Sequence, residues 1–376
     1  MFEWPIFSWQ DFWKQGDANN SEVARNLFFA LAGYAGSLFG IFQLYNTARR
    51  TRINERDSQT KLEEERNQRF ATSAVLLSHE DNSVAMAGIY ALERLATEQD
   101  AGYSKIVTET LAAFVRDHAA LTQEELEINL DREINAPQLT PDSSHDLEIS
   151  PLAPKIQAAV TALSRIRKSE NLSILECEYI DLRRTNLNGL EADNFDLRRW
   201  NFAFSNLENA DLSNSNLLEA HFYSANLKKA DLNHSNLVGA DFSFCKLHYT
   251  NFSASNMKYT ELMHIDTKNT RFDRADMSNS YWSESCLSGA TFNCTLLNSA
   301  DLHEAEDLTQ HQLNDAVWSE DLPPKLPSEY EARDFDKSIF YNAHTKKKLI
   351  LEIFDEDGLY QGYRAKIIKD KNAPST

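Results

Sequence analysis

The chain has 376 residues with 57 acidic and 38 basic side chains, and this length gives room for two or three domains. Its net charge of −19 argues against nonspecific nucleic-acid binding, which needs a cationic surface. The four cysteines show no CxxC or zinc-finger spacing, which suits a reducing compartment and argues against a disulfide framework.

Residues 1–25 are rich in aromatic side chains but lack the features of a cleaved signal peptide. Six aromatics fall in the first thirteen residues, with no cationic start and no small-residue cleavage site. Two interpretations stay open: an amphipathic or irregular lead-in, or an anchor at the membrane interface, where Trp and Phe are favoured.

Residues 26–45, NLFFALAGYAGSLFGIFQLY, form the most apolar stretch of the chain. They carry no charge over 20 residues, which is enough for about 30 Å of helix. A buried helix of a soluble domain is the alternative, but three glycines would weaken it and no other apolar segment could cover it. We therefore predict a single transmembrane helix. A cluster of arginines follows it and places the C-terminal region in the cytoplasm: Arg49, Arg50, Arg52 and Arg56.

Three small residues of this stretch, Ala32, Gly36 and Gly40, are spaced by four and share one helix face. Such spacing lets two transmembrane helices approach closely, so it offers one route to a homo-oligomer.

Residues 46–120 have the pattern of a helical region. The charged stretch 47–68 lacks Gly and Pro and is expected to continue the helix, with too few apolar residues for a coiled coil. Apolar residues then recur at helical spacing in two further segments: Val84, Ile89, Leu92 and Leu95, and Ile106, Leu111, Phe114 and Val115.

Residues 121–150 are acidic, contain two prolines and show no apolar period, so we predict an exposed linker. In 151–170, Pro154 suits the first turn of a helix with one apolar face. Because the end of a β-solenoid exposes core and unpaired edge groups, this helix is the expected N-terminal cap of the next segment.

A period of five organises residues 171–305. Counting from Leu172 to Leu302, Leu, Phe or Met fill 23 of 27 central positions. Two residues before the centre, 20 of 21 positions from Ser205 to Ala305 hold Ala, Ser, Thr or Cys. Neither a helix nor a strand gives this period, whereas one large and one small inward residue describe one side of a solenoid coil. The clearest core positions are Leu207, Leu212, Leu217, Phe222, Leu227, Leu232, Leu237, Phe242, Leu247 and Phe252.

Two pentads, Leu190/Ala192 and Ile265/Thr267, exchange the large and the small residue. Because such an exchange conserves volume, we interpret both as compensated core irregularities. Asp or Asn often precedes the centre, and this recurrence indicates turn and backbone hydrogen bonding. The examples include Asp211, Asn226, Asp231, Asn236 and Asp241.

The motif A-D/N-L-x-x resembles the signature of pentapeptide-repeat proteins. The resemblance implies a fold of class α+β, a right-handed quadrilateral parallel β-helix with four pentapeptides per coil, preceded here by a transmembrane helix and a helical block. The phrases AGIYALERLA and LAAFVRDHA are similar to the helical region of bacterial membrane-anchored members, which implies a single-pass protein of the bacterial inner membrane.

Behind the repeats, residues 306–330 resemble the tail that often ends such proteins and are expected to form a C-terminal cap. Within 331–376, two strand-like runs flank Asp357-Gly358, a strong hairpin turn signal. A calcium loop is not indicated, because the EF-hand spacing is missing.

The sequence carries no catalytic constellation, and we expect neither a cofactor nor a bound metal. GxSxG, P-loop and HExxH motifs are absent, and the histidines are scattered. Four of the five histidines in the repeats are interpreted as surface or edge side chains: His221, His234, His248 and His303.

We therefore predict a non-enzymatic, membrane-anchored cytoplasmic scaffold whose rod binds an unknown protein partner, with no direct nucleic-acid partner and homo-oligomerisation through the transmembrane helix or the rod as an open alternative. A second hypothesis is a DNA mimic, since some members of the family bind DNA gyrase, but basic pairs such as Lys228/Lys229 interrupt any acidic stripe. A third, a membrane-associated stress or phage-defence component, rests on the family resemblance alone.

Overall fold

The computed structural model describes residues 18–98, 103–122, 152–170, 177–319, 322–328, 350–354 and 360–365. The chain divides into two units, Met1–Gln68 and Arg69–Thr376, which are described separately. Residues 1–17 of the predicted aromatic segment 1–25 and most of the predicted acidic linker lie outside the described residues, while residues 18–25 belong to a helix.

The first unit is dominated by helix α2, which runs from Ala18 to Leu77 as one element of 60 residues. The uncharged stretch is the part of α2 between Arg25 and Arg49, and its large apolar side chains are 49% to 73% exposed. Within the described residues, α2 is the one helix that is long and apolar enough to cross a membrane. The transmembrane segment predicted to end at residue 45 is therefore not a separate helix. At that point α2 continues, and its composition changes from apolar to charged.

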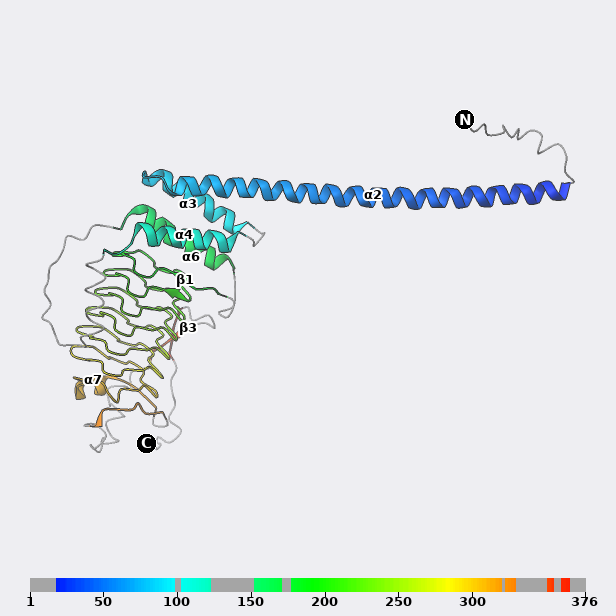
Figure 1. Ribbon diagram of the computed structural model, residues 1–376. Coiled ribbons are helices and arrows are strands. Elements are labelled where there is room, and N and C mark those ends of the chain that lie inside the picture. Colours follow the sequence, from blue (N-terminus) through cyan, green and yellow to red (C-terminus); the bar gives the residue numbers. More distant parts are fainter. Residues whose placement is uncertain are drawn as a thin grey trace, which may run out of the picture. The chain divides into compact units, whose positions relative to one another are not determined.

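Helices α3 (Asn82–Thr97), α4 (Ser104–His118) and α6 (Pro154–Glu170) pack together at one end of a rod in the second unit (Figure 1). Asp81 caps α3, because its carboxylate accepts hydrogen bonds from the N–H groups of Ser83 and Val84. The predicted inward face of α4 needs one correction: Ile106 is exposed and Val107 is buried in its place.

Gly88 marks the closest approach between α3 and the end of α2. A Cβ atom at this position would lie 2.7 Å from the Leu77 nitrogen and 2.8 Å from the Ser73 carbonyl oxygen. Only glycine fits there without moving the backbone, so the sequence of α3 fixes how near the two helices come.

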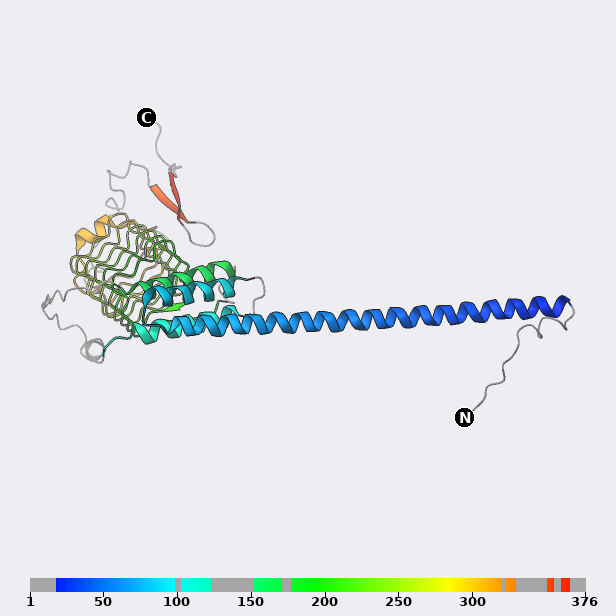
Figure 2. The same cartoon turned by 90° about the horizontal axis from the view of Figure 1, so that it is seen from above.

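The described parallel ladder of the rod joins residues exactly one coil apart, with a constant offset of twenty. Strands β1 (Ile180–Asp181) and β2 (Trp200–Asn201) pair in parallel, and single bridges such as Asn206–Asn226 and Asn226–Lys246 continue the pattern. Four pentapeptides therefore make one coil, and successive coils overlie one another (Figure 2). The predicted β-helix solenoid is confirmed.

The interior of the rod is filled by the central residues of the pentads. On one side Phe202, Phe222 and Phe242 stack with ring centroids 5.3 and 4.8 Å apart. Another stack of Phe252, Phe272 and Phe292 stands beside it, and Phe242 meets Phe252 edge to face. These arrangements are the ones that aromatic quadrupoles favour.

The corners of the rod are tight turns that place the second residue after each centre at positive φ. Asn209 has φ 57°, and its neighbour Ala210 donates its N–H to the carbonyl of Leu207. Among the described residues at positive φ, Gly holds three positions and Asn, which tolerates this conformation well, holds five; the other 17 carry residues of many types, including Arg, Phe, Tyr and His.

At one such corner we expect Asn279→Val to destabilise the protein by about 1–2 kcal/mol, because a β-branched residue is strained at the φ of 61° found there. Asn279→Gly should change the melting temperature little. Chemical denaturation of both variants measures the difference, and equal stabilities would contradict the assigned turn.

The far end of the rod is covered by helix α7 (Gln310–Asp315), as Figure 1 shows. The offset of twenty ends here, since Leu296 pairs with Val317 and Asp301 with Lys325. The Gln312 side chain donates hydrogen bonds to the carbonyls of Leu287 and Ala290 and so satisfies groups of the last coil. Beyond it, β3 (Ile350–Phe354) and β4 (Tyr360–Ala365) pair antiparallel, as a hairpin requires; the predicted turn at Asp357-Gly358 lies outside the described residues.

Candidate interaction surface

The structure places all ten core residues named from the sequence inside the rod, each with 0% of its surface exposed. The small residues two places earlier are buried as well; Ala210, Ala230 and Ala240 are at most 1% exposed. Both exchanged pairs, Leu190/Ala192 and Ile265/Thr267, are also completely buried. The period of five therefore separates inward from outward side chains. Because the inward ones are buried, a partner can contact only the outward ones.

The recurring Asp and Asn residues before the centres hold turns. The carboxylate of Asp211 accepts a hydrogen bond from the N–H of Ser213, and Asn226, Asp231 and Asp241 act in the same way on the residue two places ahead. Asn236 instead donates to the side chain of Asn216 in the neighbouring coil. These contacts are structural, as the recurrence predicts, and they leave no row of free carboxylates for acid–base chemistry.

Polar side chains close the exposed edge of the first coil beneath the helices. Gln157 of α6 exchanges two hydrogen bonds with the backbone of Glu191, and the Ser164 hydroxyl accepts the N–H of Asp196. The edge would otherwise present unpaired backbone groups, so α6 acts on it as a neighbouring strand would.

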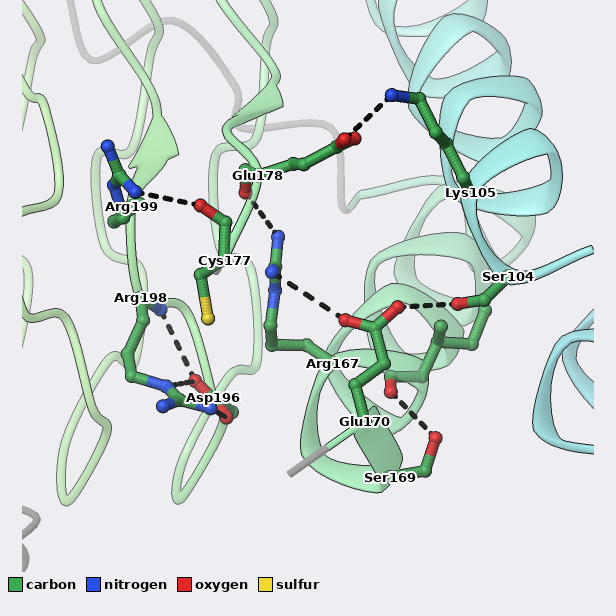
Figure 3. Close-up of polar contacts among 11 residues, drawn as sticks. Ser104, Lys105, Arg167, Ser169, Glu170, Cys177, Glu178, Asp196, Arg198 and Arg199 are labelled. Carbon is green, nitrogen blue, oxygen red and sulfur yellow. Dashed lines mark hydrogen bonds and ion pairs between the residues drawn. The ribbon is translucent and has the colours of Figure 1, made fainter. Parts of the chain in front are cut away.

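Arginine side chains add further contacts at this junction by donating hydrogen bonds to backbone carbonyl groups (Figure 3). Arg167 is only 3% exposed; it donates to the carbonyl oxygen of Glu178 and lies 3.6 Å from the carboxylate of Glu170. Glu170 in turn accepts a hydrogen bond from Ser104 of α4, while Arg199 donates to the carbonyl of Cys177. The junction thus ties α4, α6 and the first coil into one core.

We expect Arg167→Met to destabilise the protein by about 2–4 kcal/mol, because the carbonyl of Glu178 and the carboxylate of Glu170 lose a buried cationic partner. Lys105→Ala removes the exposed Lys105–Glu178 pair of the same junction and should shift the melting temperature less. Thermal unfolding of both variants compares them; a larger effect from Lys105→Ala would contradict the assigned roles.

Leu121, the first residue of the predicted linker, and Ala120 just before it are paired with the first coil. Ala120 pairs antiparallel with Thr185, and the N–H of Leu121 donates to the carbonyl of Arg184. The linker predicted from residue 121 therefore starts later than its composition indicates, because backbone pairing with the first coil holds a segment that has no apolar period.

The offset of twenty sorts the outward side chains of the rod into four sides, and one side collects lysines. Within residues 221–280 it carries four lysines and one carboxylate, whereas no other side of these coils carries more than two basic residues. We call this side the basic face, and its charged, polar and aromatic members are Asn226, Lys228, Lys229, Lys246, His248, Tyr249, Asp266, Lys268 and Asn269.

The single carboxylate of the basic face, Asp266, is engaged by His248, whose Nε2 atom lies 2.9 Å from it. Burial opposes ionisation of Asp266, but the hydrogen bond and charge of His248 outweigh it and hold the pKa of this carboxyl below its usual range. The backbone N–H of Lys268 donates a further hydrogen bond at 3.0 Å. Asp266 is therefore an ionised carboxylate held by these hydrogen bonds, and four lysines outnumber it on the basic face.

Aromatic rings form a ladder along the corner that borders the basic face. Ring centroids are 5.7 Å apart between Phe204 and Tyr223, 5.3 Å between Tyr223 and Phe244, and 4.6 Å between Phe244 and His264. All four rings are half-buried, and the Arg184 guanidinium lies 5.9 Å from the Phe204 ring. We call these four residues the aromatic corner. Sequence reasoning missed it, although an alignment of the outward residues at intervals of twenty places Phe204, Phe244 and His264 in one column, with Tyr223 one position away from it.

The small residues Ala32, Gly36 and Gly40 lie exposed on α2, and both glycines have nothing within 4 Å of a built Cβ atom. Among the described residues, no group of three or more His, Cys, Asp or Glu side chains could hold a metal ion. The histidines of the repeats serve local contacts, as where the Nδ1 atom of His221 lies 3.1 Å from the carbonyl of Glu219.

Comparisons with known proteins agree with this geometry. The family model described as pentapeptide repeats matches in eight copies, over residues 180–218, 201–237, 220–258 and 235–266. No curated protein matches the chain.

Solved structures that are similar to parts of the chain include three pentapeptide-repeat proteins. Rfr23 from the cyanobacterium Cyanothece 51142 is 24% identical, with 29% of this chain and 67% of that chain covered and a TM-score of 0.22. A protein of the Arabidopsis thaliana thylakoid lumen is 22% identical, with 33% and 72% covered and a TM-score of 0.15. HetL from Nostoc PCC 7120 is 21% identical, with 34% and 73% covered and a TM-score of 0.15. The matched repeats and the coil of twenty residues together show that the rod of this chain is built of pentapeptide repeats.

Proposed function

We propose that the protein is a non-enzymatic scaffold, anchored in the bacterial inner membrane by α2, whose cytoplasmic rod binds a partner protein. The observation that carries the anchor is the exposed, uncharged stretch of α2 between Arg25 and Arg49. In water it would leave an apolar surface along some six turns of helix uncovered, whereas a bilayer of about 30 Å accepts it. The arginines that follow it favour a cytoplasmic rod.

The rod supports binding and not chemistry. Its interior is closed by packed side chains, its polar rows hold turns, and its four long sides offer a rigid surface of regularly spaced residues. Solenoids of this kind bind partners along an extended face.

Two measurements test the proposal. A reporter fused after Thr376 should behave as cytoplasmic, and carbonate washing should leave the full-length protein in the membrane. Affinity capture of the detergent-solubilised protein should recover a partner that a variant without residues 177–306 does not recover. Full-length protein in the soluble fraction would contradict the anchor, and identical recovery by both forms would contradict binding through the rod.

A DNA-mimicking inhibitor of a topoisomerase is less well supported. The repeat segment 171–305 has 18 acidic and 11 basic residues, and the basic face interrupts its negative charge. We therefore expect no inhibition of gyrase supercoiling by the purified protein; inhibition at stoichiometric concentration would favour the mimic.

A further inference from the structure

We propose that the basic face and the aromatic corner together bind a partner segment that carries both acidic and aromatic side chains and lies along the rod. This inference rests on the proposed scaffold function and names the surface and the chemistry of the partner. Both features belong to the same coils, and the corner residue Phe244 precedes Lys246 of the basic face by two positions.

The basic face differs in charge from the rest of the molecule. In a protein of net charge −19, four lysines are gathered on one side of three adjacent coils. Backbone hydrogen bonds between coils, such as Lys229 N–H to His248 carbonyl and Tyr249 N–H to Lys268 carbonyl, fix their spacing. A cationic strip on a rigid anionic protein attracts an anionic ligand and repels a cationic one.

The aromatic corner borders the basic face and adds apolar surface to it. Phe204, Tyr223 and Phe244 stand at turns; Tyr223 meets Phe204 edge to face and Phe244 at a tilt, and all three residues are partly exposed. Partly exposed aromatic rings on a fixed scaffold can bury further apolar area at little entropic cost and commonly anchor peptide segments. An extended segment with alternating side chains presents two different rows, so one row can meet the lysines and the other the rings.

The surface between the two rows is polar and ordered. Asn206 and Asn226 form a side-chain ladder, with 2.9 Å between the Asn226 nitrogen and the Asn206 oxygen. The Asn226 nitrogen also lies 3.3 Å from the Glu208 carboxylate, and the Asn206 nitrogen donates to Asn186, so both amides are held in fixed positions on the surface. Single-stranded nucleic acid would also combine charge with stacking, but the repeat segment's net charge of −7 opposes a polyphosphate. We therefore assign the face to a peptide.

The test uses the full-length protein in detergent and a fluorescein-labelled twelve-residue peptide built of Glu and Phe in alternation. Fluorescence anisotropy should show saturable binding that weakens as salt is raised. The triple variant K228Q/K229Q/K268Q should weaken binding at least about tenfold, since an exposed charge pair is worth up to about fivefold. The matched control K258Q/R271Q/R274Q also removes three positive charges, but from two of the three sides outside the basic face. It should change affinity less than twofold.

The aromatic corner is tested by Phe244→Asn. Asn occupies the same turn position in other coils, as Asn209 does at φ 57°, so the fold should be kept, and a melting curve verifies this. We expect at least tenfold weaker binding of the Glu-Phe peptide by the folded variant, and no binding of a Glu-Ala peptide by the wild type.

Three results would overturn the inference: equal weakening by the control triple variant, equal binding of a Lys-Phe peptide, or binding of a labelled single-stranded oligonucleotide in preference to the acidic peptide. Failure of the inference is distinguishable from failure of the scaffold function. If affinity capture still recovers the partner with K228Q/K229Q/K268Q but not without the rod, the rod is a scaffold and the partner lies on another side.

Discussion

Leu232→Asp should unfold the rod. Leu232 is completely buried in the core, and the N–H of this residue donates to Asn251 while the carbonyl accepts from Ser235, so the backbone cannot move the side chain outward. A carboxylate placed there has no cationic partner, and burying an unpaired charge costs more than about 4 kcal/mol. Circular dichroism of the purified full-length protein should show loss of the rod signal while the helical signal of α2 persists.

The matched control for Leu232→Asp is Lys229→Ala in the preceding turn. Lys229 is exposed, and Ala254 shows that alanine is accepted at the same turn position with φ 60°. The variant should stay within about 0.5 kcal/mol of the wild type. If the two variants melted alike, the assignment of inward and outward positions would be wrong.

Ala230→Leu is expected to destabilise the rod although it adds apolar surface. Ala230 is 1% exposed, and its own N–H closes a turn onto the carbonyl of Leu227, so the added atoms have no space. Overpacking of a tight core costs about 1–3 kcal/mol. Chemical denaturation measures the loss.

An exchanged pair elsewhere in the rod indicates how the stability lost in Ala230→Leu could be restored. Leu190 and Ala192 stand two coils before Ala230 and Leu232, in the same columns, with the large and small residues exchanged. Leu232→Ala alone should cost about 2–5 kcal/mol through the cavity it leaves. The double variant Ala230→Leu/Leu232→Ala should be more stable than the sum of the two changes predicts, because one fills the space the other empties. Strict additivity would show that the two positions do not share one space.

The rod was predictable from sequence because every pentad repeats the same physical rule. A buried residue such as Phe242 and a small residue such as Ala240 recur in one register, so each coil corroborates the next. The helical block was less predictable. Val84 is only half-buried and Ile106 is exposed, because the faces of α3 and α4 are set by their packing against each other and α6, which no single period encodes.

The candidate surface was not predictable by reading neighbours along the chain. Tyr223, Phe244 and His264 are about twenty residues apart and look unrelated in the sequence, and Gly88 gives no sign of the backbone it faces. Arg167 likewise has the appearance of a solvated charge in a helix, whereas the carbonyl of Glu178 draws it into the junction. Such contacts depend on coil register and helix placement, which local patterns do not carry.

Residues that are twenty apart in the sequence lie on the same side of the rod, so the length of the chain between two residues determines whether they share a side. Removal of twenty residues from the middle of the ladder would shorten the stack by one coil and leave every later side chain on its own side. Removal of five would keep each pentad intact but rotate all that follows by one side, so Lys268 would leave the line of Lys228. The length of an insertion or deletion, more than its sequence, therefore determines whether a binding face is kept, shortened or cut in two.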